Sequence, residues 1–182
     1  MKNEFAPRHL HIAAFAKNQG TLAGEEKLAA FERLMHESQG LGGETFVSYA
    51  AQGSVKPDAA GVDEPWVHVS AQAILSLVCQ RCLGAVDVAV SVERDFRFVA
   101  SEELAEVEDE ESEEDVLVIS KSFDLLELVE DELLMAAPLV PMHEECPQPV
   151  KLQVADVGFE SQPEEKPNPF AVLEQLKTKG SS

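Results

Sequence analysis

Three cysteines and one histidine have the types and spacing of metal ligands. Cys79 and Cys82 form a C-x-x-C pair with Gly84 two residues further on, and His143 and Cys146 form an H-x-x-C pair with the same spacing. Tetrahedral zinc takes four such ligands, and a tight turn can aim two thiolates at one ion. The sequence therefore offers a zinc site of Cys79, Cys82, His143 and Cys146. The alternative is a protein without a cofactor, whose reduced thiols are partly buried.

Other chemistry finds little support in the sequence. A thioredoxin-like redox pair needs a helix N-terminus to lower the pKa of its first cysteine, and no helix pattern follows Cys82. The chain has no glycine-rich phosphate loop, no G-x-S-x-G motif and no H-E-x-x-H motif, and its five histidines are scattered. We therefore expect a protein that is not an enzyme, and no small-molecule substrate is evident.

The C-x-x-C pair lies between two strand patterns. Residues 66–78 and 86–99 alternate apolar and polar side chains, as expected for an antiparallel sheet with one buried face. Residues 8–12, 45–51 and 116–119 are further predicted strands, and residues 57–65 are a predicted loop. The sequence thus predicts a mostly antiparallel β-sheet whose strands flank the cysteines.

Helical spacing occurs in two internal segments. In residues 25–38, four apolar side chains recur at intervals of three or four residues, and Thr21 could cap this helix. Residues 123–137 form the second predicted helix, which Asp124 caps and Pro138 ends. Glu132 falls within the apolar face of the second helix, so its carboxylate must reach the edge of that face, form a local ion pair or face a partner protein.

The C-terminal segment contains a third, short helix pattern. Asn168 is a suitable cap and Pro169 a suitable first helical residue. A helix of two or three turns is marginal in water, so it must dock on its own sheet or on another molecule. The predicted partner-binding residues are Glu132, Pro169, Phe170, Leu173 and Leu176. We divide the chain into a core domain, residues 1–157, and a linker with a docking helix, residues 158–182.

The charge is strongly acidic and unevenly distributed. The 182 residues include 14 Lys plus Arg and 34 Asp plus Glu, which gives a net charge of −20. Ten acids fall within residues 101–115, so we expect a solvated, disordered loop there, or a lure for a basic partner. Such charge disfavours direct RNA binding, for which Arg81, Arg94 and Arg97 are the only candidate basic residues.

The length and the hydrophobic pattern indicate a small intracellular protein. At 182 residues, one domain is expected, because a domain commonly has about 100–200 residues. We find neither a leader pattern nor an apolar run of membrane-spanning length, so we expect a cytoplasmic protein with no membrane contact. The predicted fold class is α+β: a single domain with a mostly antiparallel sheet, two or three packed helices, an acidic flexible loop and a short C-terminal helix.

Four segments together resemble one family. They are residues 79–83 (CQRCL), 128–134 (LVEDELL), 137–143 (APLVPMH) and 166–173 (KPNPFAVL). In this order they resemble the YceD family of bacterial large ribosomal RNA subunit accumulation proteins. The resemblance implies a non-enzymatic role in the synthesis, processing or stability of large-subunit (23S) ribosomal RNA.

The negative net charge of the chain and its resemblance to the YceD family together favour a ribosome biogenesis factor that acts through protein contacts. Its expected partner is a ribosomal protein or a large-subunit assembly factor, with indirect or weak contact to ribosomal RNA. One alternative is a direct RNA-binding module that uses a sheet face carrying Arg81, Arg94 and Arg97. The other is a small metal-dependent enzyme.

Overall fold

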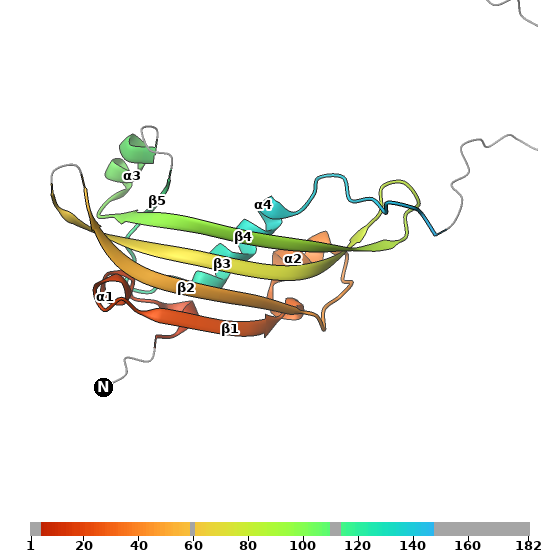
Figure 1. Cartoon of the computed structure of the whole chain (residues 1–182), viewed down its shortest axis with the longest axis horizontal. Coiled ribbons are helices and arrows are strands. Elements are labelled where there is room, and N and C mark those ends of the chain that lie inside the picture. The colour runs from red at the N-terminus through yellow and green to blue at the C-terminus, as the bar shows by residue number, and fades with distance from the viewer. Residues whose placement is uncertain (1–4, 59–60, 110–113, 148–182) are drawn as a thin grey trace, which may run out of the picture. The chain divides into compact units, whose positions relative to one another are not determined.

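A five-stranded sheet forms the centre of the fold. The structure is a computed structural model and describes residues 5–58, 61–109 and 114–147. The strands lie in sequence order, each of the first four antiparallel to its neighbour, and β5 runs parallel to β4 (Figure 1). Their bounds are β1 Thr21–Lys27, β2 Phe46–Pro57, β3 Asp63–Val78, β4 Ala85–Val99 and β5 Asp115–Val118. This arrangement confirms the predicted α+β fold with a mostly antiparallel sheet.

The strand patterns decide which face of the sheet is buried. In β3 the alternate residues from Val67 to Leu77 are buried, and in β4 the register places Val90 opposite Ala73 on the same face. Side chains of a strand alternate between the two faces, so the other face carries residues such as Gln72 and Ser91. The apolar face therefore needs a layer of helices.

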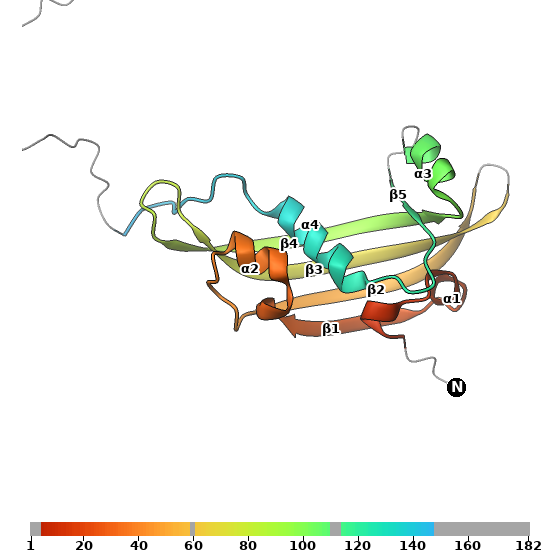
Figure 2. The ribbon, with the colours of Figure 1, turned by 180° about the vertical axis from the view of Figure 1, so that it is seen from behind.

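That layer lies on one side of the sheet. Figure 2 shows α4 (Leu125–Ala136) and α2 (Glu32–Glu37) over the same face. The Asp124 side chain caps α4 by accepting from the backbone N–H groups of Leu126 and Glu127 at 2.9 and 3.2 Å. The buried apolar residues of α4 are Leu125, Leu126, Val129 and Leu133. The predicted second helix and its cap are confirmed.

Helices α1 (Ile12–Lys17) and α3 (Glu102–Asp109) lie at the end of the sheet where β2 turns into β3 (Figure 1). Helix α1 packs on β2, where a Cβ atom at Gly53 would lie 2.6 Å from the Phe15 carbonyl oxygen. Only glycine permits this close approach of two backbones. Helix α3 follows β4, and the 3₁₀ turns η1 and η2 span Pro7–His9 and Leu28–Ala30. No helix among the described residues is long and apolar enough to cross a membrane.

The structure corrects two predictions near the N-terminus. Residues 25–38 are not one helix, because β1 takes Thr21–Lys27 and the helix is only Glu32–Glu37. The apolar stripe itself is right, since Leu28, Phe31 and Leu34 are all buried, but pairing of β1 with β2 outweighs helix propensity. Residues 8–12 are not a strand either, because the 3₁₀ turn η1 and a single bridge from Leu10 to Phe123 replace it.

The acidic run is not a loop throughout. Its first part forms α3, where the Ser101 Oγ atom accepts from the Leu104 backbone N–H at 3.4 Å. Acidic side chains at a helix N-terminus interact favourably with the helix dipole, which offsets some of their repulsion. Glu108 also pairs with Arg97 of β4 at 2.9 Å. Residues 110–113 and the predicted docking helix with Pro169, Phe170, Leu173 and Leu176 lie outside the described residues.

Helix α2 takes its N-terminal cap from α4. Its own cap position, Phe31, has no side-chain acceptor. The buried Glu130 carboxylate of α4 supplies the missing acceptor. Its Oε1 atom accepts from the backbone N–H groups of Arg33 and Leu34 at 2.7 and 3.2 Å. Its Oε2 atom accepts from the Arg33 Nε atom at 3.1 Å. One carboxylate thus joins two helices that are almost a hundred residues apart in the sequence.

We predict that Glu130→Ala destabilises the fold by about 2–3 kcal/mol, because it removes a helix cap and a charge-assisted pair from a buried position. Asp131→Ala is the matched control, since Asp131 also pairs with Arg33 but is half exposed, and it should cost less than about 1 kcal/mol. Urea denaturation of both variants measures the difference. Equal losses would show that Glu130 is no more than a surface charge.

Candidate metal centre

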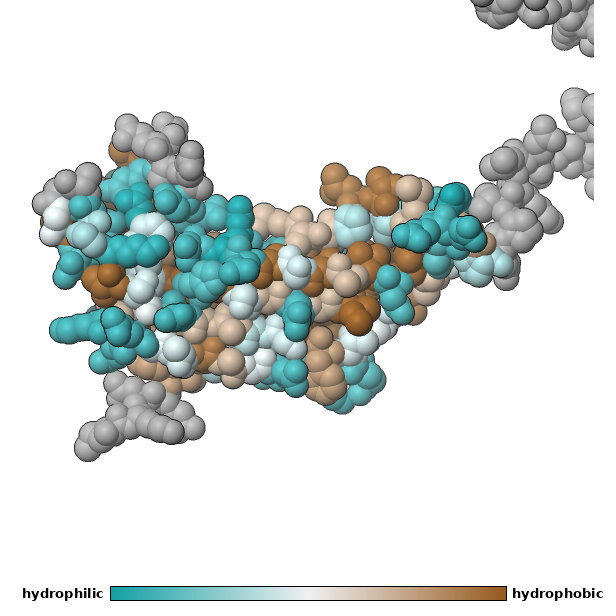
Figure 3. Space-filling model, viewed as in Figure 1, coloured by the Kyte–Doolittle hydropathy of each residue, from teal (hydrophilic) through white to brown (hydrophobic). Residues whose placement is uncertain are grey.

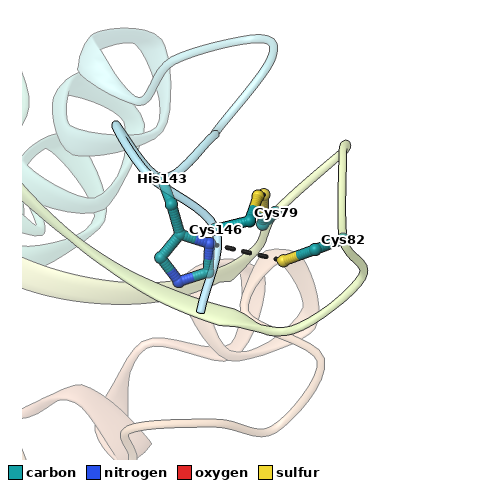
Figure 4. Close-up of side chains that lie close together, drawn as sticks. All are labelled: Cys79, Cys82, His143 and Cys146. Carbon is teal, nitrogen blue, oxygen red and sulfur yellow. Dashed lines mark hydrogen bonds between the residues drawn. The ribbon is translucent and has the colours of Figure 1, made fainter. Parts of the chain in front are cut away.

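The four predicted ligands lie together at the end of the sheet where β3 turns into β4. One donor atom from each of Cys79, Cys82, His143 and Cys146 lies within 4.8 Å of the other three (Figure 4). Cys79 is fully buried and the other three are partly buried. The two pairs, which no local pattern connects in the sequence, are thus joined by the fold.

The first pair sits on a tight turn between β3 and β4. The Cys79 backbone N–H donates to the Gly84 carbonyl oxygen at 2.8 Å, and the Leu83 N–H donates to the Cys79 carbonyl oxygen at the same distance. Leu83 has a φ of 60°, in the left-handed region that closes such a turn. This turn points the Cys79 and Cys82 side chains toward one place.

The second pair reaches the turn because α4 crosses the sheet and ends beside it. Pro138 stops α4, and the following segment is held by the Gln80 backbone N–H, which donates to the Pro141 carbonyl oxygen at 2.9 Å. Arg81 holds the same segment, because its guanidinium donates to the carbonyl oxygens of His143 and Glu144 and, at 3.1 Å, to the Cys146 Sγ atom. Arg81 is therefore a positioning residue of this cluster.

Two of the donor-atom separations are close to those around a tetrahedral ion. Zinc–sulfur bonds of about 2.3 Å and zinc–nitrogen bonds of about 2.0–2.1 Å imply sulfur–sulfur separations of about 3.8 Å and sulfur–nitrogen separations of about 3.6 Å. The Cys79 and Cys146 Sγ atoms are 3.9 Å apart, and the Cys82 Sγ and His143 Nδ1 atoms are 3.4 Å apart. The cluster could therefore hold a metal ion.

The histidine ring is oriented as a ligand. Its Nε2 atom lies 2.9 Å from the Ala85 carbonyl oxygen, which can only accept, so Nε2 carries the proton. The Nδ1 lone pair then faces the sulfur atoms. Metal-bound histidines generally donate their second ring N–H in this way, which fixes both tautomer and orientation.

The two thiols of the turn have shifted pKa values. Burial opposes ionisation of Cys79, but backbone hydrogen bonds at His143, Cys82 and Arg81 outweigh it and lower the pKa to about 5. Cys82 differs: a backbone hydrogen bond at Gly84 favours its thiolate, whereas burial and the neighbouring sulfur atoms together raise its pKa. One thiolate is thus favoured by the protein alone, and a bound metal ion would ionise the others.

The three candidate RNA-binding arginines do not share a face. Arg94 and Arg97 are three residues apart in β4, so they point to opposite sides of the sheet, and Arg81 lies in the turn beyond it. Arg94 pairs with Glu132 and Asp115 at 3.3 and 3.2 Å. Arg97 pairs with Glu64 and Glu108 at 3.3 and 2.9 Å. The three arginines therefore do not form one basic face of the sheet, and their binding of RNA stays a prediction.

Glu132 takes the local ion pair that the sequence left open. Its carboxylate is 5% exposed and pairs with Arg94 of β4. Burial raises the pKa of Glu132 above its usual value, although the Arg94 guanidinium lowers it in part. The sequence analysis selected Glu132 but missed Glu130, whose signal was its place in the same acidic motif at the edge of the apolar face.

The structure therefore defines a small α+β protein with a three-cysteine, one-histidine cluster at one end of its sheet. Residues 67–177 match the family model described as large ribosomal RNA subunit accumulation protein YceD, and the chain belongs to this family. The protein of that name from Haemophilus influenzae is 40% identical over 110 residues, which cover 58% of this chain and 61% of the relative. The match thus spans less than two thirds of that relative. No solved structure matches the chain.

We predict that Arg94→Ala destabilises the protein by about 1–3 kcal/mol at pH 7, because it leaves the buried Glu132 carboxylate without its main counter-charge. A folded-state pKa above the unfolded value means that the folded state binds the proton more tightly. The loss should therefore shrink as the pH falls through that raised pKa.

Denaturation curves of both proteins from pH 7 to about pH 4 measure this dependence. The double variant Arg94→Ala/Glu132→Gln is the control, and its loss should be smaller and independent of pH in this range. A single-variant loss that is the same at every pH would show that Glu132 does not cause it.

Proposed function

We propose that this protein supports the accumulation of large-subunit ribosomal RNA as a non-enzymatic ribosome biogenesis factor, through contacts with proteins. Membership of the YceD family supports the process, because the relative from Haemophilus influenzae is named for it. The net charge of −20 supports the means, since a strongly acidic chain repels phosphate and attracts basic proteins. A ribosomal protein or an assembly factor is the partner that we propose.

The contacts of the three candidate arginines favour binding of proteins over direct binding of RNA. Each arginine that could have met a phosphate already holds an acceptor: Arg94 and Arg97 pair with carboxylates, and Arg81 holds the Cys/His cluster. A phosphate would have to displace these partners, so it would gain little counterion release. RNA is then contacted weakly or through the partner.

We propose zinc as the ion of the Cys/His cluster, because three thiolates and an imidazole within 4.8 Å of one another suit zinc best. Four protein ligands leave no position for a substrate, so a bound zinc ion would supply structural stability. Cys79 and Cys82 would hold it from the turn, and His143 and Cys146 from the segment after α4. The Arg81 guanidinium would offset the excess negative charge of three thiolates.

We predict about one equivalent of zinc in protein purified without chelator, because a closed structural site should be nearly full. Cys79→Ser should lower both the zinc content and the melting temperature, whereas His36→Ala, at an exposed histidine away from the cluster, should change neither. Elemental analysis and thermal denaturation measure the two quantities. Less than about a tenth of an equivalent in the unaltered protein would rule out the zinc site.

We also predict that cells lacking the protein accumulate less large-subunit ribosomal RNA and that the intact chain restores the level. A pull-down of the tagged chain should recover a basic protein even after ribonuclease treatment, because protein contacts do not need RNA. Recovery that depends on RNA, with affinity falling steeply as salt rises, would instead favour the RNA-binding module.

A further inference from the structure

An exposed apolar surface lies beside the Cys/His cluster. Figure 3 shows hydrophobic atoms gathered at the edge of the sheet, over the segment that follows α4. We call this the exit surface and define it by five exposed side chains: Leu83, Met135, Leu139, Val140 and Met142. Leu139 is 99% exposed, and large apolar side chains grouped in this way usually mark an interaction site.

Two segments far apart in the sequence build the exit surface. Leu83 belongs to the β3–β4 turn. Met135 lies at the end of α4, and Leu139, Val140 and Met142 belong to the segment that follows it. The hydrogen bond from the Gln80 N–H to the Pro141 carbonyl oxygen fixes one segment against the other. The Cys/His cluster joins them again, through the 3.4 Å contact of the Cys82 Sγ and His143 Nδ1 atoms. The cluster thus positions this surface.

The conformation of Leu83 indicates a role for its side chain. Its φ of 60° is one that glycine adopts more readily, and its side chain is 76% exposed. The backbone at position 83 would favour glycine, and the exposed side chain adds nothing to the core. The stability of the fold therefore does not explain why this residue is leucine. A bulky apolar side chain that is both strained and exposed is consistent with binding.

The charge around the exit surface selects the kind of partner. Residues 139–147, which contribute three of the five side chains of the exit surface, contain two glutamates and no Lys or Arg. Glu130 and Glu132 are occupied within the fold, but Glu144 and Glu145 are exposed and have no ion pair among the described residues. Among the described residues, the nearby cation Arg81 is engaged with the Cys/His cluster. A complementary partner is therefore apolar on one face and positively charged beside it.

We propose that the exit surface binds an amphipathic, lysine- or arginine-bearing helix of a partner protein. The apolar face of the helix would contact Leu83, Leu139 and Val140, and its basic residues would meet Glu144 and Glu145. The two methionines of the surface suit this use, because their side chains adapt to different partners. The inference rests on the proposed function through protein contacts, and it adds the surface and the chemistry of the partner.

The test uses the full chain and a synthetic helical peptide with leucines on one face and lysines on the other. Fluorescence anisotropy should show binding that weakens with salt. A peptide with glutamates in place of the lysines should bind at least about tenfold more weakly, since its charge would be repelled. A peptide of the same composition with its leucines scattered should lose a similar factor.

Leu83→Gly and Leu139→Ser should each weaken peptide binding several-fold while leaving the melting temperature unchanged. Glycine suits the backbone at position 83, and Leu139 touches no core, so both variants should fold. The matched control is Leu104→Ser/Val107→Ser, which removes two exposed apolar side chains from the acidic helix α3. Equal binding by the exit-surface variants and by this control would overturn the proposal.

Two further outcomes would also overturn it. A concentration-dependent dimer that Leu139→Ser abolishes would assign the exit surface to a second copy of the chain. Tighter binding of a single-stranded RNA oligonucleotide than of the basic peptide would assign it to nucleic acid. The rescue experiment keeps the two proposals distinct: rescue by the intact chain supports the proposed function, and equal rescue by Leu83→Gly would overturn only the role of the exit surface.

Discussion

The packing of α4 across the sheet is the interaction on which the rest of the structure depends. The buried side chains of α4 cover the apolar face of β3 and β4; they are Leu125, Leu126, Val129 and Leu133. Full burial of each such side chain stabilises the fold by about 1.5–3 kcal/mol. Two acidic residues then fix its position, because Glu130 caps α2 and Glu132 pairs with Arg94. With α4 held in this way, the segment that leaves it must pass the β3–β4 turn.

The Cys/His cluster is a consequence of that path. Only when α4 ends at the turn can His143 and Cys146 approach the C-x-x-C pair, and hydrogen bonds from Gln80 and Arg81 complete the approach. The same geometry leaves the apolar residues after α4 exposed rather than buried. A structural ion at the cluster would therefore stabilise both the end of the fold and the surface that we propose for binding.

The strong negative charge has two different uses. Inside the fold, Glu130 pairs with Arg33 and Glu132 pairs with Arg94, so these carboxylates join elements and one candidate RNA-binding arginine already has a carboxylate partner. Outside, Glu144 and Glu145 are exposed and have no ion pair among the described residues, so they leave a field that favours basic molecules. This distribution of charge is the reason why we propose protein contacts rather than direct binding of phosphate.

The sequence alone determined the features that rest on local periodicity and ligand chemistry. The alternation in β3 and β4, the capped helix α4 and the two pairs of candidate metal ligands were all readable, because each follows from spacing within one segment. Tertiary structure decided the rest. Pairing with β2 made a strand of residues whose stripe had suggested a helix, and strand parity placed Arg94 and Arg97 on opposite faces. Whether Glu132 met a partner or an arginine, and whether the two ligand pairs met at all, depended on contacts between segments that no local pattern encodes.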